Sequence, residues 1–255
     1  MFTTFYCHFL SLSMFVDYIS SSHLTNRICV SLLISFNHTM RIYLLPLLLC
    51  FVVPTIGKAQ NFQLHSNSVT ITCDDAAVGE SGTIGGITYT KIDSKDSLQV
   101  FGGGVPADQA CTSGVTSMSG WLGFGFGDDR ELRYSYNPDI SHWDVSDVTN
   151  MNFMFNNLRG FNQDLSYWDV SKVTRFYATF QNARAFNSDI SSWDVSSGEI
   201  FGYMFWSADA FNIDIGDWDL SGIDVSNTYG SKTGVDNMFQ GANIFNQDLS
   251  GWCVS

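Results

Sequence analysis

The hydrophobic positions in the C-terminal half of the chain repeat every 25 residues. Each unit opens on an aromatic residue followed by asparagine; the pairs are Tyr136-Asn137, Phe161-Asn162, Phe186-Asn187, Phe211-Asn212 and Phe245-Asn246. Tryptophans keep the same spacing, at Trp143, Trp168, Trp193, Trp218 and Trp252. The last interval is 34 residues, which indicates a 9-residue insertion at 222–230. A period of this length is typical of an array of stacked units.

Each unit contains two hydrophobic patterns. The first half reads Ile140-x-x-Trp143-x-Val145-x-x-Val148, the spacing of a leucine-rich repeat, and predicts a short parallel strand. The second half has apolar residues at offsets 0, 3, 4, 7 and 10 from Met151, the stripe of an amphipathic helix. The sequence therefore predicts an α/β repeat solenoid of leucine-rich-repeat-like coils, each a short strand plus a short helix, which bury a continuous core when stacked.

Polar residues recur in register with this core. The asparagines of the five aromatic–Asn pairs would form a ladder in which each amide bonds to the backbone of the next coil. An aspartate that follows each pair would accept backbone N–H groups at a tight corner, at Asp139, Asp164, Asp189, Asp214 and Asp248. Both columns predict hydrogen bonds that hold the coils in register.

Residues 60–112 lack the full repeat and predict an N-terminal β-rich cap. Val69-Thr70-Ile71 and Ile87-Thr88-Tyr89-Thr90 alternate like strands. The residues 115–118 match the step at 148–151, so a first half-coil begins near Cys111. We expect the coils to occupy residues 113–255, with the solenoid truncated at its C-terminus because the last unit is incomplete. A cap is needed to cover the open end of such a core.

The N-terminal segment reads as targeting sequence. Arg41, an apolar run at 42–53 and the small residue Ala59 predict a signal peptide at 40–59, and residues 1–39 then read as a non-native extension. The apolar run is too short to span a membrane, so we expect no transmembrane segment in the mature chain. These features predict a secreted or cell-surface protein.

Export also bears on the cysteines, since it permits disulfides. Three of the six cysteines lie before residue 60, and Cys73, Cys111 and Cys253 follow it. We expect a disulfide between Cys73 and Cys111, which leaves the partner of Cys253 open. No two cysteines have the spacing of a zinc site.

The charge balance excludes one class of partner. The chain carries a net charge of −13, and residues 1–59 contribute Arg27, Arg41 and Lys58 against Asp17, so residues 60–255 carry −15. An acidic surface repels phosphate backbones, and nucleic acid is therefore excluded as an expected partner.

The amino-acid sequence of the repeats also resembles that of a known family. The stretches FNQDLSYWDVSKVT at 161–174 and DISHWDVSDVTNMNFMF at 139–155 resemble the BspA-like leucine-rich-repeat surface proteins. ITCDDAAVGESGTIGGITYTKID and CTSGVTSM upstream resemble the lead-in segment of such proteins. The resemblance implies a secreted or surface-attached protein, with adhesion as the activity of some relatives, and it brings no catalytic residues.

The polar positions of the predicted strands would line a concave face. The candidate binding residues are Asp144, Asp169, Asp194, Asp219, Ser146, Ser171, Ser196, His142, Tyr167 and Asp217. Four stacked carboxylates repel by up to roughly 3 kcal/mol for each neighbouring pair, less with screening. Hydrogen bonds from the serines and backbone, bound calcium, or a carboxylate-pair glycosidase site would each account for the column.

We therefore expect a binding or adhesion module that acts through its concave face on a surface protein or glycan of a host or neighbouring cell. The alternatives are a structural spacer without a specific ligand and, last, a carbohydrate-active enzyme. We expect no catalysis, because no nucleophile–base pair is suggested and the aspartate column is uniform. No cofactor is expected, and calcium is the one ion that the column would suit.

Overall fold

The computed structural model describes residues 28–29, 50–51, 61–123, 130–223 and 234–252. The chain divides into two compact units, Met1–Ala59 and Gln60–Ser255. In the first unit, β1 (Ile28–Cys29) and β2 (Cys50–Phe51) pair antiparallel. The predicted extension at 1–39 and signal peptide at 40–59 otherwise lie outside the described residues, as do Cys253 and residues 224–230 of the predicted insertion at 222–230. Among the described residues, no helix has the length and apolar character that a membrane span requires.

The second unit begins with small sheets. They comprise β3 (Gln63–Leu64), β4 (Ile71–Thr72), β5 (Ser81–Ile84), β6 (Ile87–Lys91) and β7 (Ala110–Cys111), with 3-10 helices η1 (Lys95–Ser97), η2 (Gln99–Phe101) and η3 (Ala107–Gln109). β3 pairs antiparallel with β4, and β6 lies between antiparallel β5 and parallel β7. A disulfide joins Cys73, just after β4, to Cys111 in β7. We call residues 61–111 the cap region.

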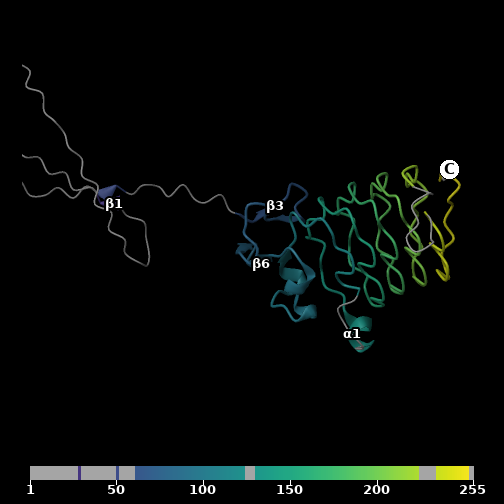
Figure 1. The fold of residues 1–255 in the computed structure, drawn as a ribbon, viewed down its shortest axis with the longest axis horizontal. Coiled ribbons are helices and arrows are strands. Elements are labelled where there is room, and N and C mark those ends of the chain that lie inside the picture. Colours follow the sequence, from purple (N-terminus) through teal and green to yellow (C-terminus); the bar gives the residue numbers. More distant parts are fainter. Residues whose placement is uncertain (1–27, 30–49, 52–60, 124–129, 224–233, 253–255) are drawn as a thin grey trace, which may run out of the picture. The chain divides into compact units, whose positions relative to one another are not determined.

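Stacked coils follow the cap region, and Figure 1 shows them side by side from teal to yellow. Single-residue parallel bridges connect consecutive coils, from Ser117 to Asn150, Arg175 and Ile200. The amide of Thr149 donates to the carbonyl oxygen of Thr116 at 2.9 Å. Residues 116 and 117 therefore lie beside the first full repeat.

The predicted α/β solenoid, with one helix and one strand in each repeat, is wrong. The one α-helix among the described residues is α1 (Arg130–Ser135), which has six residues and precedes the first aromatic–Asn pair. Across 136–223 and 234–252 the described backbone contains turns and isolated bridges in place of helices and strands. The 25-residue period is real, but the local structure inside each period is different.

The helix-like spacing arises from consecutive tight turns. The amide of Met154 donates to Met151 and that of Leu158 to Phe155, both at 3.1 Å, which is the three-residue step of a turn. Phe153 and Asn157 have φ near +60°, which a helix does not allow. The amide of Phe155 donates to Thr179 in the next coil at 2.9 Å. Steps of three and four residues return the chain to the core as a helix would, while alternate amides bond to the neighbouring coil.

The segment predicted as a strand is also built from tight turns. Trp168 and Val170 are both buried, as period-two spacing predicted. The amide of Trp168, however, donates to the Leu165 carbonyl and that of Val173 to the Val170 carbonyl, so the segment is a pair of turns. Inward side chains at positions i and i+2 therefore do not by themselves indicate a strand.

Aromatic columns fill the core of the coils. Phe180 stacks on Phe155 and Phe205 in the adjacent coils, with ring centroids 5.1 and 5.7 Å away. Phe186, which opens the next unit, also stacks on Phe180 at 3.9 Å. These rings are fully buried. Stacking of this kind adds roughly 0.5–1.5 kcal/mol for each pair beyond the burial of apolar area.

An asparagine ladder runs beside the aromatic columns, as predicted. The Oδ1 of Asn162 accepts the backbone N–H of Asn187 at 2.8 Å, and that of Asn187 accepts Asn212 at 2.8 Å. Asn137 and Asn212 bond in the same way to the asparagine of the following coil. The ladder spans the 34-residue interval, so the insertion leaves the stacking register unchanged.

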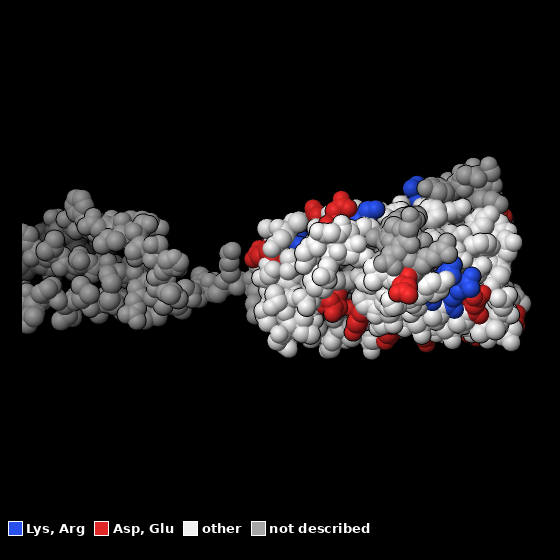
Figure 2. Space-filling model, turned by 90° about the horizontal axis from the view of Figure 1, so that it is seen from below, with Lys and Arg blue, Asp and Glu red and all other residues white. Residues whose placement is uncertain are grey.

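The surface differs in character from the core. On the face drawn in Figure 2, small groups of acidic and basic side chains, several of them side by side, lie scattered over an area that is otherwise uncharged. Single ion pairs link neighbouring coils, such as Lys172 to Asp147 and Arg184 to Asp209. Exposed pairs of this kind contribute little to stability, so the coils depend on their apolar core and backbone bonds.

Candidate functional site

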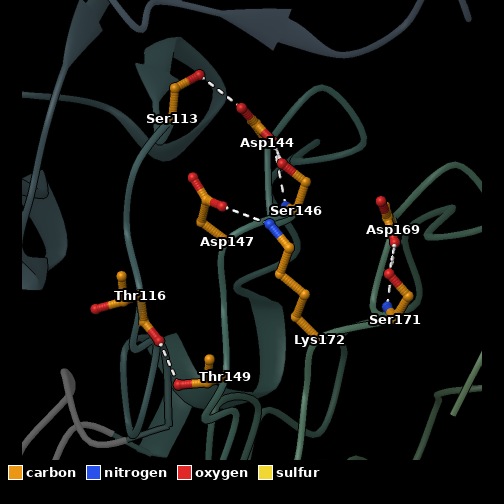
Figure 3. Close-up of polar contacts among 9 residues, drawn as sticks. All are labelled: Ser113, Thr116, Asp144, Ser146, Asp147, Thr149, Asp169, Ser171 and Lys172. Carbon is orange, nitrogen blue, oxygen red and sulfur yellow. Dashed lines mark hydrogen bonds and ion pairs between the residues drawn. The ribbon is translucent and has the colours of Figure 1, made fainter. Parts of the chain in front are cut away.

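The aspartates of the predicted concave face each cap a tight turn. Asp169 Oδ1 accepts the backbone N–H of Ser171 at 3.1 Å and its hydroxyl at 2.6 Å. Asp194 repeats this arrangement with Ser196, and Asp144 with Ser146. Figure 3 shows the Asp144 and Asp169 turns from two successive coils. The prediction that serine and backbone donors satisfy the column is confirmed.

The hydrogen bonds from these donors also oppose the electrostatic repulsion between stacked carboxylates. The hydroxyl and then the backbone N–H of Ser196 hold the pKa of Asp194 below its ordinary value, and the charge of Asp219 opposes this less strongly. Ser221 lowers the pKa of Asp219 in the same way. At Asp194, hydrogen bonds to the charged form outweigh the repulsion from the carboxylate of the next coil.

The corner aspartates Asp189 and Asp248 also accept hydrogen bonds from the serine two residues later. Asp189 Oδ1 accepts the backbone N–H of Ser191 at 2.9 Å and its hydroxyl at 2.7 Å, which lowers its pKa. Asp248 and Ser250 repeat the turn near the end of the stack. Among the described residues, no three His, Cys, Asp or Glu side chains gather closely enough to hold a metal ion.

One part of the column differs, because it opens onto a pocket of about 370 Å³. The pocket lies between the β3–β4 turn and the first two full coils. The coil residues that line it are Trp143, Asp144, Val145, Ser146, Asp147, Tyr167 and Asp169, and the cap residues are His65, Asn67, Thr70, Thr72 and Asp74. We call it the cap pocket. It brings together four predicted site residues: Asp144, Ser146, Tyr167 and Asp169.

The other predicted residues lie elsewhere. Ser171 bonds to Asp169 beside the cap pocket without lining it. Asp194, Ser196, Asp217 and Asp219 follow on later coils and line no part of it. His142 is buried, with 8% of its surface exposed. The structure thus divides the predicted set into a pocket group, a plain turn column and one interior histidine.

His142 joins the first coil to the cap region. Its Nε2–H donates to the carbonyl oxygen of Ala110 at 3.0 Å, and its own carbonyl oxygen accepts the N–H of Ile71 at 2.9 Å. The Tyr89 ring lies 5.1 Å from the imidazole. Burial lowers the pKa of His142, and the bond to Ala110 offsets this in part. This histidine positions β4 against the coil.

A second contact fixes the inner wall of the cap pocket. The hydroxyl of Ser113 donates to Asp144 Oδ2 at 2.7 Å, as Figure 3 shows. The same Ser113 Oγ accepts the backbone N–H of Cys73 at 3.0 Å. Asp144 is therefore linked through one hydroxyl to the disulfide-bonded end of β4, which ties the pocket wall to the Cys73–Cys111 disulfide.

Sequence reasoning missed the cap side of the pocket. Asn67 Oδ1 accepts the backbone N–H groups of Val69 and Thr70 at 3.0 and 2.9 Å, which makes the tight turn between β3 and β4. An Asn-Ser pair before an apolar run signals such a turn. Nothing in the local sequence shows that this turn lies against Asp144 and Tyr167.

The lining of the cap pocket is acidic. Asp74, Asp144, Asp147 and Asp169 supply four carboxylates, and no Lys or Arg is among its lining residues. Lys172, one coil away, pairs with Asp147 at 2.7 Å. Asp147 raises the pKa of Lys172 by a hydrogen bond and by its charge. This pair is exposed, so it screens only part of the acidic character.

Comparison with known proteins adds a relationship for the repeats. No curated protein and no solved structure shows significant similarity to the chain. A family model matches the stretch that contains α1 and the full coils through Trp252. The repeat region, at residues 126–252, is thus similar to the family described as "Mycoplasma protein of unknown function, DUF285".

Proposed function

We propose that the chain is a secreted or cell-surface repeat protein that binds a ligand at the cap pocket. The observation that carries the proposal is the position of Tyr167, whose side chain is 49% exposed beside a 370 Å³ pocket. A concave pocket with an aromatic wall and convergent polar groups is the usual form of a ligand site. Export is supported by the signal-like segment at 40–59 and by the Cys73–Cys111 disulfide.

The BspA-like resemblance and the family match agree on a repeat protein, and an adhesion role for this chain is part of the proposal. The description of the matched family names no activity. Adhesion would place the ligand on another cell or on its surface polymers, as a protein or a glycan. The acidic balance of residues 60–255 favours ligands that are neutral or cationic.

A structural spacer is the second candidate, because the later coils repeat one turn chemistry. Asp194 and Asp219 sit in the same kind of Asp–Ser turn. A spacer, however, does not require the exposed tyrosine at 167, where the next coil has Ser192. This position varies from coil to coil, and its exposed tyrosine falls at the cap pocket, which favours binding there.

We further propose that the protein is not an enzyme. A retaining glycosidase needs two carboxyl groups in different environments, one of them kept protonated. Asp144 and Asp169 each accept the backbone N–H and the hydroxyl of the serine two residues later, and Asp144 also accepts the hydroxyl of Ser113, so both carboxylates act as hydrogen-bond acceptors within the protein. Incubation of the chain with a panel of oligosaccharides would contradict this proposal if any glycosidic bond were cleaved.

Binding is tested by probing an array of surface oligosaccharides and synthetic peptides with the fluorescently labelled chain. We expect saturable binding to at least one probe class that Tyr167→Ser abolishes. Tyr134→Ser is the matched control, because Tyr134 is also 49% exposed but lies on α1, away from the cap pocket. Equal loss in both variants, or no binding by the unmodified chain, would favour the spacer.

A further inference from the structure

We propose that the cap pocket binds a cationic side chain, with arginine the best match, from a basic polypeptide partner. The inference rests on the proposed function, since it names the ligand class of the same pocket. Its basis is the balance of hydrogen-bond donors and acceptors in the lining, the aromatic wall, the pocket volume and the charge around it.

Several donors of the lining are committed within the protein. The hydroxyl of Ser146 donates to Asp144 at 2.8 Å, and the amide of Asn67 donates to the hydroxyl of Thr70 at 2.8 Å. The hydroxyl of Thr72 points to the carbonyl of Gln63 at 3.5 Å. The hydroxyls of Thr70 and Tyr167 and the ring of His65 remain as donors, so a bound molecule meets fewer donors than the four carboxylates offer acceptor positions.

Acceptors remain available. Asp169 uses Oδ1 for both of its bonds to Ser171, which leaves Oδ2 to accept from a ligand. An ionised carboxylate has about four acceptor positions, and three bonds reach Asp144. A sugar needs donors as well as acceptors from its site, whereas a guanidinium has five N–H donors and no acceptor. The lining thus matches a guanidinium or an ammonium group better than a sugar.

Tyr167 supplies the surface on which a planar cation would lie. An arginine guanidinium stacks on aromatic faces, and its fork of N–H groups binds carboxylates through two bonds. Tyr167 and Asp169 are two residues apart in the lining of the pocket. The next coil has Ser192 and Asp194 at these positions, so it keeps the carboxylate and lacks the ring.

Size and charge restrict the partner further. A pocket of about 370 Å³ is near the lower end of small-ligand sites, which suits one side chain with its flanking backbone. The net charge of −15 on residues 60–255 attracts a basic segment from a distance. A phosphorylated or sulfated ligand would meet four carboxylates and be repelled.

The test uses the full chain and three short capped peptides that differ at one central residue: arginine, citrulline or lysine. Citrulline keeps the shape of arginine and removes its charge. We expect saturable binding of the arginine peptide, measured by NMR titration, with shifts confined to Trp143, Tyr167 and their neighbours. The citrulline peptide should bind at least roughly tenfold more weakly, because it loses the charge-assisted bonds.

Two matched variants distinguish binding at the cap pocket from general attraction to the acidic surface. Asp169→Asn should weaken binding of the arginine peptide roughly tenfold, since hydrogen bonds to a charged group are about twice as strong as neutral ones. Asp189→Asn removes the same charge from the same kind of Asp–Ser turn in the corner column, and should change binding less than about twofold. An asparagine oxygen can still cap either turn, so both variants should fold.

Several results would overturn the inference. Equal binding of the arginine and citrulline peptides would remove the cationic requirement, and equal loss in the two aspartate variants would show diffuse attraction. If an oligosaccharide binds in a Tyr167-dependent way and the arginine peptide does not, the proposed function stands and the cationic ligand is wrong. If neither probe shows Tyr167-dependent binding, both proposals fail.

Discussion

The indole N–H of Trp193 donates a hydrogen bond to the carbonyl oxygen of Leu165, 3.0 Å away in the preceding coil. The other tryptophans of the repeat make the same bond, from Trp143 to Ala107, Trp168 to Ile140, Trp218 to Ile190 and Trp252 to Ile215. A buried carbonyl at each turn is thereby satisfied by a side chain of the next coil. This explains why tryptophan, among large apolar residues, recurs at this position.

Replacing Trp193 with phenylalanine should lower the free energy of unfolding by about 1–3 kcal/mol, because the Leu165 carbonyl loses its partner in a buried setting. Urea unfolding followed by circular dichroism measures the change. Trp252→Phe is the control, since its bond to Ile215 is only partly buried and should be worth less. An equal loss in the two variants would assign the effect to ring volume instead of the hydrogen bond.

The asparagine ladder gives a second prediction. Asn187→Ala removes the acceptor of the Asn212 N–H at 2.8 Å and should destabilise the chain by about 0.5–1.5 kcal/mol. Asn187→Asp keeps an oxygen at this place and should restore much of the loss. Thermal unfolding of the three proteins is the measurement. The ladder would be unimportant to stability if the alanine variant unfolded at the same temperature as the unchanged chain.

The sequence predicted the columns of this fold because each is a property of a single position repeated at fixed spacing. The buried Trp193, the Asn187 ladder and the Asp194 turn all followed from the 25-residue period and from ordinary side-chain chemistry. The sequence did not correctly predict the path of the backbone within each repeat. Turns with left-handed residues such as Phe153 produce the same inward spacing as a helix, and apolar periodicity alone does not distinguish them.

The sequence predicted residues of the cap pocket that lie on the coils, and it did not predict those that lie in the cap region. Asp169 stood out as a member of a repeated column, and Tyr167 as an aromatic residue at a position that varies between the coils. His65 and Asp74 carry no such signal, since their place beside the first coil depends on contacts remote in sequence, such as Ile71 to His142. Long-range placement of an unrepeated segment cannot be read from local pattern.

The buried histidine makes stability depend on pH. The pKa of His142 is lowered from 6.5, chiefly by burial, so the unfolded chain takes up a proton before the folded one does. Its contribution to stability is therefore present above pH 6.5 and is lost as the pH falls from 6.5 toward the lowered value. We expect the unfolding temperature to decrease over this range, while His142→Gln flattens the decrease. A ring signal of His142 that titrates at or above pH 6.5 in an NMR experiment would contradict the prediction.

The disulfide gives the last prediction, since it ties the cap region to the wall of the cap pocket. Cys73 and Cys111 are 38 residues apart, and closing a loop of that length restricts the unfolded chain by about 4 kcal/mol in the entropic account. Reductant should therefore lower the unfolding temperature of the chain and leave a Cys73→Ser/Cys111→Ser double variant unaffected. Hydrogen exchange should show the first losses of protection at Ile71 and Cys73, because their amides bond to His142 and Ser113. If reduction instead loosened the later coils first, the cap would not depend on this bond, and the pocket wall would need another anchor.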